Sequence, residues 1–230
     1  MDKRIIIQIN NKTMKKILLS TVFSLVLSIF AMAQTVEKTY QFGTPTVSVV
    51  NGYDVVSFAG TRNMGETGKA TLPCQQVSLL LPPNTQAQNI SVSYDDIVEL
   101  EGTYNLLPSQ QVRPLSSTEP IVFEKDEAFY RSGEVYPLEA VSKVSSQYLN
   151  GCSFAMATFT PVQYVPATGK VSYARTVTVT VEYAASRADK GNLLWMTPEV
   201  QAKVERLAQN PEAVADYKTQ IGRAVQQECR

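Results

Sequence analysis

The chain has 230 residues, enough for one or two domains, and its 44% hydrophobic and 18% charged residues are typical of a globular protein. It contains no histidine, which excludes a Ser-His-Asp or Cys-His catalytic arrangement and any His-ligated metal site. The 21 basic and 21 acidic residues balance, and no basic run is interleaved with aromatic residues, so nucleic-acid binding is disfavoured.

Residues 1–33 have the pattern of a leader and signal peptide. Met14-Lys15-Lys16, with Met14 as the predicted true start, precedes an apolar stretch that ends in the small-x-small sequence Ala31-Met32-Ala33. Cleavage is therefore expected between Ala33 and Gln34, giving an exported protein, periplasmic or secreted, without a membrane span. Because residues 1–33 hold five basic residues and one acidic residue, the mature chain keeps 16 basic and 20 acidic residues, a net charge of −4.

Residues 34–190 are predicted to form a mainly β domain. Asn51-Gly52 between Val47–Val50 and Val55–Phe58 is a favoured two-residue hairpin turn. Val171–Tyr183 alternates apolar residues at odd positions with mostly polar ones at even positions, with Arg175 as an exception expected near a rim. Further strands are expected at residues 77–81, 89–94, 97–101, 120–123, 154–160 and 163–165, the last of them turning at Pro166–Lys170 into a hairpin with the long strand. This spacing of short strands and turns predicts an antiparallel β-sandwich.

Residues 191–230 change to a helical period and predict a short C-terminal helical tail. Thr197-Pro198-Glu199 is a helix start with a capping hydroxyl and a proline at the first helical position. Val200, Val204, Leu207 and Ala208 then share one face. Asn210-Pro211-Glu212 repeats the start pattern before a second apolar stripe at Val214, Tyr217, Ile221 and Val225.

The three cysteines allow two interpretations. In an oxidising compartment Cys74 and Cys152 are candidates for a disulfide that would leave Cys229 free. The alternative is that the thiols are unpaired and half-buried. Sequence alone leaves both open.

Other chemistry is weakly represented. Acidic residues gather at Asp95-Asp96, at Glu99 and Glu101, and at Glu124-Asp126-Glu127, where a glycosidase pair or a Ca²⁺ site would need them, but adjacent acids in loops are usually only solvated. Gly65–Lys69 superficially resembles a phosphate loop but lacks the required spacing, and we interpret it as a turn. We therefore predict no catalytic residues, no metal and no cofactor.

Three sequence blocks in order resemble the N-terminal propeptide of gingipain-type cysteine peptidases, over residues 42–185. The first block is Gly68–Pro73 with Val77–Pro83, the second is Phe129–Pro137, and the third is Phe159–Val171, which joins a strand through P-x-Q-Y-x-P-x-T-x-K to the long alternating strand. The resemblance implies a β-sandwich without catalytic activity that follows a signal peptide, keeps a peptidase inactive or helps it fold, and is then cut away. The partner would be the peptidase domain, in cis or from an adjacent gene.

The resemblance also implies two functional positions. In the family an arginine on an exposed loop enters the specificity pocket of the protease, and the matching loop here is Leu106–Leu115 with Arg113 as the candidate. Its register from Pro108 differs from the family pattern by about two residues. Arg230 is a candidate processing site. The alternative function is that of a secreted β-sandwich module for adhesion or carbohydrate binding.

Overall fold

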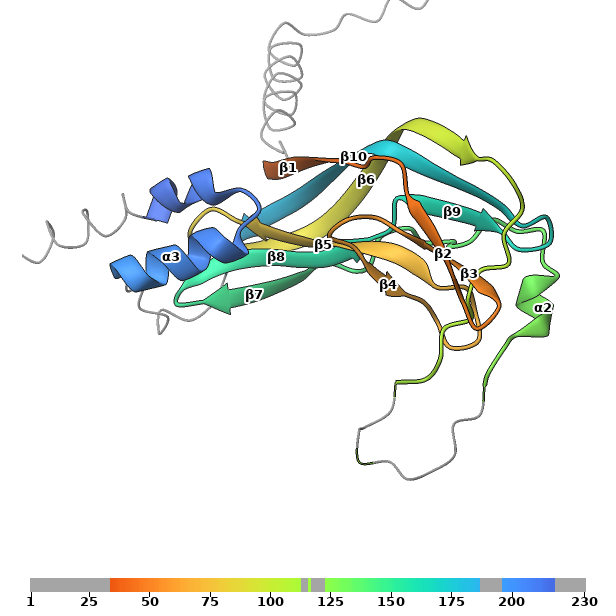
Figure 1. The fold of residues 1–230 in the computed structure, drawn as a ribbon. Coiled ribbons are helices and arrows are strands. Elements are labelled where there is room, and N and C mark those ends of the chain that lie inside the picture. Colours follow the sequence, from red (N-terminus) through yellow and green to blue (C-terminus); the bar gives the residue numbers. More distant parts are fainter. Residues whose placement is uncertain (1–33, 113–115, 117–122, 187–195, 218–230) are drawn as a thin grey trace, which may run out of the picture. The chain divides into compact units, whose positions relative to one another are not determined.

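The computed structural model describes residues 34–112, 116, 123–186 and 196–217 (Figure 1), and from Thr35 onward these belong to one compact unit. The strands are β1 (Gln34–Gln41), β2 (Thr46–Val50), β3 (Tyr53–Ser57), β4 (Arg62–Met64), β5 (Leu72–Leu80), β6 (Thr85–Leu100), β7 (Ser145–Leu149), β8 (Cys152–Phe159), β9 (Val162–Val165) and β10 (Lys170–Ala185). The helical elements are α2 (Glu127–Tyr130), α3 (Pro198–Leu207) and the 3₁₀ turn η2 (Pro211–Ala213).

Two four-stranded antiparallel sheets form the sandwich, as predicted. In the first sheet β10 lies between β1 and β6 and also pairs with β9. Side-chain hydrogen bonds join Glu37 to Thr180 and Thr39 to Thr178, so β1 runs antiparallel to β10. In the second sheet the strand order is β4-β5-β8-β7. A separate hairpin joins β2 to β3.

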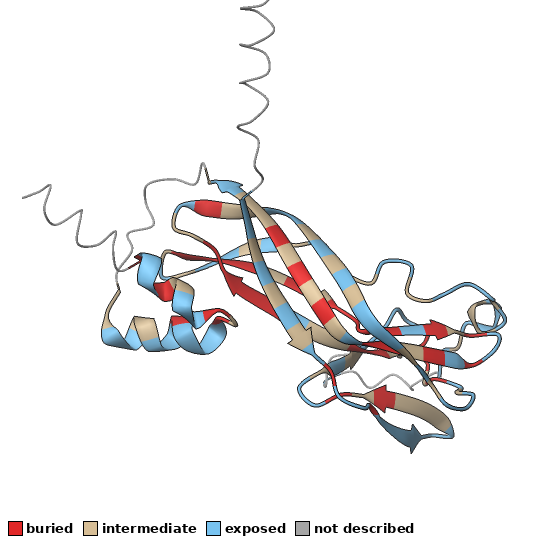
Figure 2. Cartoon of the chain, turned by 90° about the horizontal axis from the view of Figure 1, so that it is seen from above, coloured by how far each residue is buried: buried red, intermediate tan, exposed pale blue. Residues whose placement is uncertain are grey.

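The core fills the space between the sheets because one face of each long strand is apolar. Along β10 the side chains of Val177, Val179 and Val181 are fully buried, while the threonines between them are not (Figure 2). From the second sheet Val77, Leu79 and Phe159 contribute to the same cluster. The predicted period-two alternation is therefore confirmed. It is broken only around Arg175, which is exposed and pairs with Asp96 at 3.5 Å.

Turn chemistry fixes the hairpins. Asn51 and Gly52 both have positive φ, 52° and 80°, as the two-residue turn between β2 and β3 requires. Asn150 and Gly151 repeat this geometry between β7 and β8. The predicted hairpin into the long strand is also confirmed, with Lys170 opposite Val165. The preceding strand, β8, belongs to the other sheet.

The strands predicted at 89–94 and 97–101 are in fact one strand, β6, so the predicted break at Asp95-Asp96 is wrong. The equally long β10 pairs with β6 on both sides of this point, and Asp96 accommodates the irregularity with a φ of 53°. Of the strand predicted at 120–123, only Phe123 lies among the described residues, and it is not in a strand.

The helical tail begins as predicted and then departs from the prediction. The Thr197 hydroxyl accepts a hydrogen bond from the Val200 backbone N–H at 3.3 Å, and Pro198 opens α3. Val204 and Ala208 are buried, but Leu207 is 40% exposed. Ile221 and Val225 of the second predicted stripe lie outside the described residues. None of the described helices is long and apolar enough to cross a membrane.

Asn210 does not cap a helix, contrary to the local pattern. Its side chain instead forms two hydrogen bonds with Leu80 of β5, accepting from the backbone N–H at 2.7 Å and donating to the carbonyl at 2.9 Å. The Tyr217 hydroxyl donates to the Leu81 carbonyl at 2.7 Å. These contacts close a second apolar cluster, made of Leu80, Cys152, Phe154, Val204, Ala208, Val214 and Tyr217.

Candidate functional site

The most elaborately anchored loop leaves the sandwich after Gln110 and returns at Glu124. Its incoming arm is held by backbone hydrogen bonds on two sides. The Leu107 N–H donates to the Asp54 carbonyl of β3 at 2.9 Å, and the Thr71 N–H donates to the Leu107 carbonyl at 2.8 Å. Two residues later, Ser109 exchanges hydrogen bonds with the turn at Gly68 and Lys69. The arm is thus fixed to the sheets up to the point where the loop begins.

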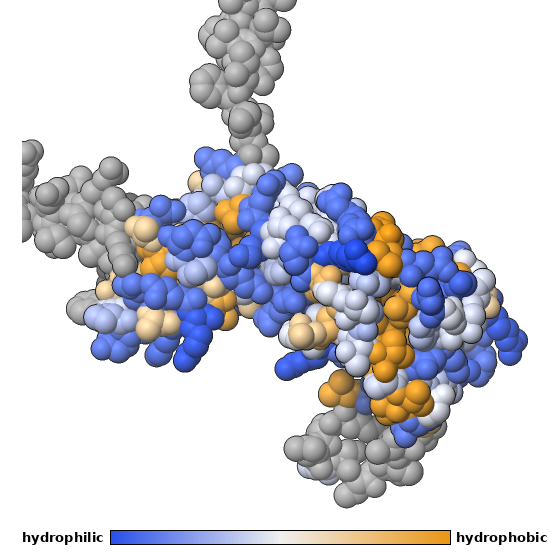
Figure 3. Space-filling view, turned by 45° about the horizontal axis from the view of Figure 1, so that its top comes forward, coloured by the Kyte–Doolittle hydropathy of each residue, from blue (hydrophilic) through white to orange (hydrophobic). Residues whose placement is uncertain are grey.

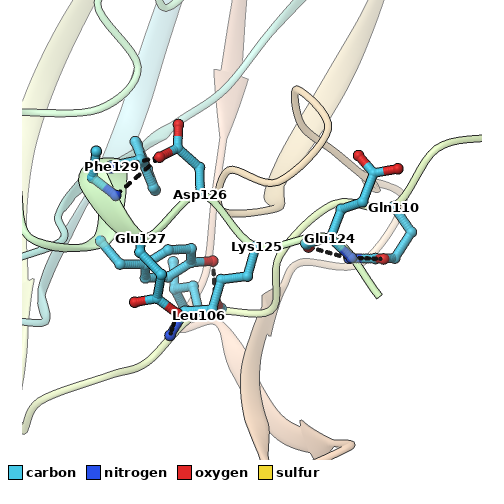
Figure 4. Close-up of polar contacts among 9 residues, drawn as sticks. Leu106, Gln110, Glu124, Lys125, Asp126, Glu127 and Phe129 are labelled. Carbon is cyan, nitrogen blue, oxygen red and sulfur yellow. Dashed lines mark hydrogen bonds and ion pairs between the residues drawn. The ribbon is translucent and has the colours of Figure 1, made fainter. Parts of the chain in front are cut away.

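A side-chain clamp closes the base of this loop (Figure 4). The Gln110 amide nitrogen donates to the Glu124 carbonyl at 2.9 Å, and the Gln110 amide oxygen accepts from the Glu124 backbone N–H at 2.9 Å. The same amide nitrogen also lies 3.0 Å from the Pro108 carbonyl. Because one side chain satisfies both backbone groups of Glu124, the two arms are held together as adjacent strands would be.

Aromatic and charged groups fix the returning arm. The Phe123 ring stacks on Tyr53 of the β2–β3 hairpin, with centroids 5.7 Å apart. The Lys125 ammonium lies 4.8 Å from the centroid of the Tyr130 ring and 5.8 Å from that of Tyr53, within the range of cation–π attraction. Glu127 pairs with the same ammonium at 3.3 Å. The returning arm is therefore held by contacts with the β2–β3 hairpin and with the residues of α2.

The short helix α2 locks the two arms to each other. Asp126 caps it by accepting from the backbone N–H groups of Ala128 and Phe129, each at 3.0 Å. The Tyr130 hydroxyl donates to the Leu106 carbonyl of the incoming arm at 2.6 Å (Figure 4). Burial raises the pKa of Tyr130, so the phenol keeps the proton that this hydrogen bond needs.

Some of the predicted site residues lie outside the described part of the chain. Arg113, Ala33 and Arg230 lie outside the described residues, whereas Val112, next to Arg113, is 95% exposed. Gln34 is the first residue of β1 and is exposed. The roles of these residues stay predictions.

Cys74 and Cys152 are both free thiols, so the candidate disulfide does not form. The register explains why. Cys74 precedes Gln75, the first β5 residue paired with β8, while Cys152 begins β8 at the other end of that pairing. This register separates the two cysteines by eight residues of extended strand. That length corresponds to about 27 Å, far beyond the reach of a disulfide. Burial raises the pKa of both thiols, that of Cys152 to about 11.

Several of the acidic residues flagged by the sequence have structural partners. Glu99 pairs with Lys170 at 2.6 Å, Asp96 pairs with Arg175, and Asp126 caps α2. Among the described residues no group of three acidic or cysteine side chains is arranged to hold a metal ion. Gly65–Lys69 is a turn, as predicted, closed by a hydrogen bond from the Lys69 N–H to the Glu66 carbonyl at 3.0 Å.

Sequence reasoning missed the residues that build the loop base, namely Tyr53, Gln110, Phe123, Lys125 and Tyr130. No local pattern marks them, because each acts through a partner from another part of the chain. Only the Asn-Gly turn before Tyr53 could have indicated that an aromatic residue stands at a hairpin end.

Comparison with known proteins finds one family and solved structures that match this chain. The Propeptide_C25 family model matches residues 32–197. A solved complex of Porphyromonas gingivalis RgpB pro- and mature domains is similar, with a TM-score of 0.60 and 18% identity, over 77% of this chain and 93% of that one. A structure on the zymogenic latency of gingipain K from the same organism matches with a TM-score of 0.53 and 19% identity, over 68% and 90% of the two chains. No curated protein sequence matches.

The two solved structures share the fold, and the family model covers well over half of the sequence, including all ten strands of the described residues. The chain is therefore a member of the Propeptide_C25 family, the propeptides of gingipain-type peptidases.

Proposed function

We propose that this chain is exported and then binds a gingipain-type cysteine peptidase as its inhibitory propeptide, with the loop between Gln110 and Glu124 inserted at the active site. The clamped loop base carries this proposal. Arms that are already fixed lose little conformational entropy on binding, so more of the contact energy appears as affinity.

Arg113 would be the residue that enters the specificity pocket. An arginine that fills a pocket contributes buried area and a charge-assisted hydrogen bond to an acidic group at its base. The loop must also resist cleavage, and Pro114 directly after Arg113 makes the following peptide bond a poor substrate. The offset of Arg113 from the family register is the point that the experiment has to test.

Processing completes the proposed sequence of events. The signal peptide would be removed between Ala33 and Gln34, and a peptidase encoded in cis would be released by a cut at Arg230. Mass spectrometry of the exported protein measures both ends. A mature N-terminus other than Gln34 would contradict the first cut.

The inhibition constant of the purified chain against a gingipain-type peptidase tests the function. We expect inhibition in the nanomolar to micromolar range, and Arg113→Ala should weaken it by about 2 kcal/mol or more, roughly 30-fold. Arg206→Ala, at an exposed arginine of α3, is the matched control and should leave inhibition unchanged. No inhibition by the unaltered chain at high micromolar concentration would overturn the function, whereas an unchanged constant for Arg113→Ala would overturn only the role of that residue.

A further inference from the structure

The outer edge of β2 presents backbone groups without a partner among the described residues. Val50 and Tyr53 face each other across the two-residue turn, so the next pair, Val49 and Asp54, does not exchange hydrogen bonds. Asp54 indeed uses its N–H and carbonyl on the other side, for Asn105 and Leu107, both at 2.9 Å. The N–H and carbonyl of Val49 must therefore point away from β3.

The same reasoning applies two residues earlier. Val47 faces Val56, whose carbonyl accepts a hydrogen bond from the Asn63 side-chain amide at 2.9 Å and not from β2. Within the described part of the chain β2 has only β3 as a neighbour. Val47 and Val49 thus offer two N–H donors and two carbonyl acceptors in a row along one open edge.

This edge lacks the usual protection against strand pairing. Edge strands in soluble proteins commonly carry a charged residue, a proline or a bulge. β2 has the sequence Thr-Val-Ser-Val-Val, with none of these, and all five residues are exposed. The side chains of Val47 and Val49 are 38% and 69% exposed. The strand is suited to accept another extended segment.

The hairpin that carries the open edge also adjoins the loop base at its turn. Tyr53, which faces Val50 across the hairpin, stacks on Phe123 of the returning arm. Phe123 is 47% exposed, and Val112, where the incoming arm enters the loop, is 95% exposed. Hydrophobic residues gather on the surface at this end of the sheets (Figure 3). A protein that surrounds the loop would therefore meet the β2 edge as well.

We propose that the outer edge of β2 pairs with an extended, uncharged segment of the peptidase and adds it to the β2–β3 sheet as a third strand. This inference rests on the proposed function. Main-chain hydrogen bonds from Val47 and Val49 supply the pairing, and their exposed side chains contact alternate residues of the added strand. The loop and the edge then form one continuous interface with the same partner.

Proline at the edge tests this pairing, since Val49→Pro removes an N–H that makes no bond to β3 and leaves the hairpin ladder intact. We expect this variant of the full chain to inhibit the peptidase about tenfold more weakly. Val49→Ala keeps the backbone donor and should weaken inhibition less than about threefold. Tyr148→Pro is the matched control, because Tyr148 stands at the same position before the Asn150-Gly151 turn at the outer edge of β7. It should leave inhibition unchanged.

Hydrogen exchange of the unaltered chain, followed by NMR, tests the pairing without any substitution. In the free protein the amides of Val47 and Val49 should exchange rapidly while that of Ser48, bonded to Val55 across the hairpin, exchanges slowly. In the complex all three should exchange slowly. Amides of Val47 and Val49 that stay fast in a formed complex would overturn the pairing and leave the proposed inhibition standing. If these two amides exchange slowly in the isolated chain, and the slowing disappears on dilution, the edge pairs with a second copy of this chain. That result would equally overturn the pairing with the peptidase.

Discussion

Two strand edges of this protein are treated in opposite ways. The outer edge of β5, beyond the residues that pair with β4, is covered by the tail, where Gln209 and Asn210 act like a short added strand. The Gln209 N–H donates to the Ser78 carbonyl, and its side-chain oxygen accepts from the Ser78 N–H, both at 2.9 Å. Asn210 repeats this exchange at Leu80. The outer edge of β2 has no such cover among the described residues.

The difference separates an edge that belongs to the fold from one that is available to a partner. At β5 polar side chains replace backbone partners while apolar groups of α3 and η2 exclude water, so the edge is closed permanently. At β2 the exposed residues are valine, serine and threonine, which suit a strand but offer nothing to close its edge. The following predictions, from the largest expected effect to the smallest, test this separation.

Asn210→Ala should destabilise the folded protein by about 3 kcal/mol, because it leaves the N–H and the carbonyl of Leu80 buried without partners. Urea unfolding measures this change. Val49→Pro, at the open edge, should by contrast cost less than about 0.5 kcal/mol, as expected for a surface substitution that breaks no ladder bond. Equal losses for the two variants would show that the edges do not differ in their contribution to the fold.

Gln110→Ala should lower stability by only about 1 kcal/mol, because the clamp lies at a partly exposed loop base. Its larger effect should be on inhibition, weakened about fivefold since the loop arms are no longer held together before binding. Gln110→Glu keeps the acceptor for the Glu124 N–H but loses the donor, and should fall between the two proteins. A Gln110→Ala variant that inhibits as well as the unaltered chain would show that the clamp is not needed to prepare the loop.

The buried Cys152 thiol beneath the tail should make stability depend on alkaline pH. Burial raises the pKa of this thiol from 9.0 to about 11 in the folded protein. Below pH 9 the thiol is protonated in both states, and its contribution to stability is fully present. As the pH rises through 11 that contribution is lost, because the unfolded chain releases the proton first.

Urea midpoints at pH 8 and at about pH 10.5 measure this dependence. The unaltered chain should lose more stability over this interval than Cys152→Ala, which cannot titrate at that position. Cys74, which lies only partly buried and away from the tail cluster, provides the comparison, and Cys74→Ala should behave more like the unaltered chain. Identical pH profiles for all three proteins would contradict a closed tail cluster.

Sequence predicted the features whose cause is local. Asn51-Gly52 needs no distant partner to form its turn, and the alternation of β10 follows from residues that are adjacent in the chain. Prediction from sequence failed where a partner far away in the chain determines the local structure. Asp95-Asp96 looks like a break until the continuous β10 is placed beside it, and Asn210 looks like a helix cap until Leu80, 130 positions away, is brought into contact.

The candidate site divides in the same way. The loop from Leu106 to Leu115 is predicted through resemblance, because family motifs survive as short runs of sequence. Its base was not, since the pairing of Gln110 with Glu124 and the stacking of Phe123 on Tyr53 exist only after the chain has folded. Periodicity and turn patterns describe elements, whereas this site is made of contacts between elements.

One hydrogen bond has a consequence for the order in which the protein folds. The Tyr40 hydroxyl of β1 donates at 2.6 Å to the side-chain oxygen of Gln209, which lies 169 positions later and also holds Ser78. The first strand and the tail complete each other, so a chain emerging from its N-terminus cannot finish folding until the tail at Gln209 has been made. Late completion of this kind would suit the export that we propose, because a polypeptide without its final shape can still pass through a translocation pore.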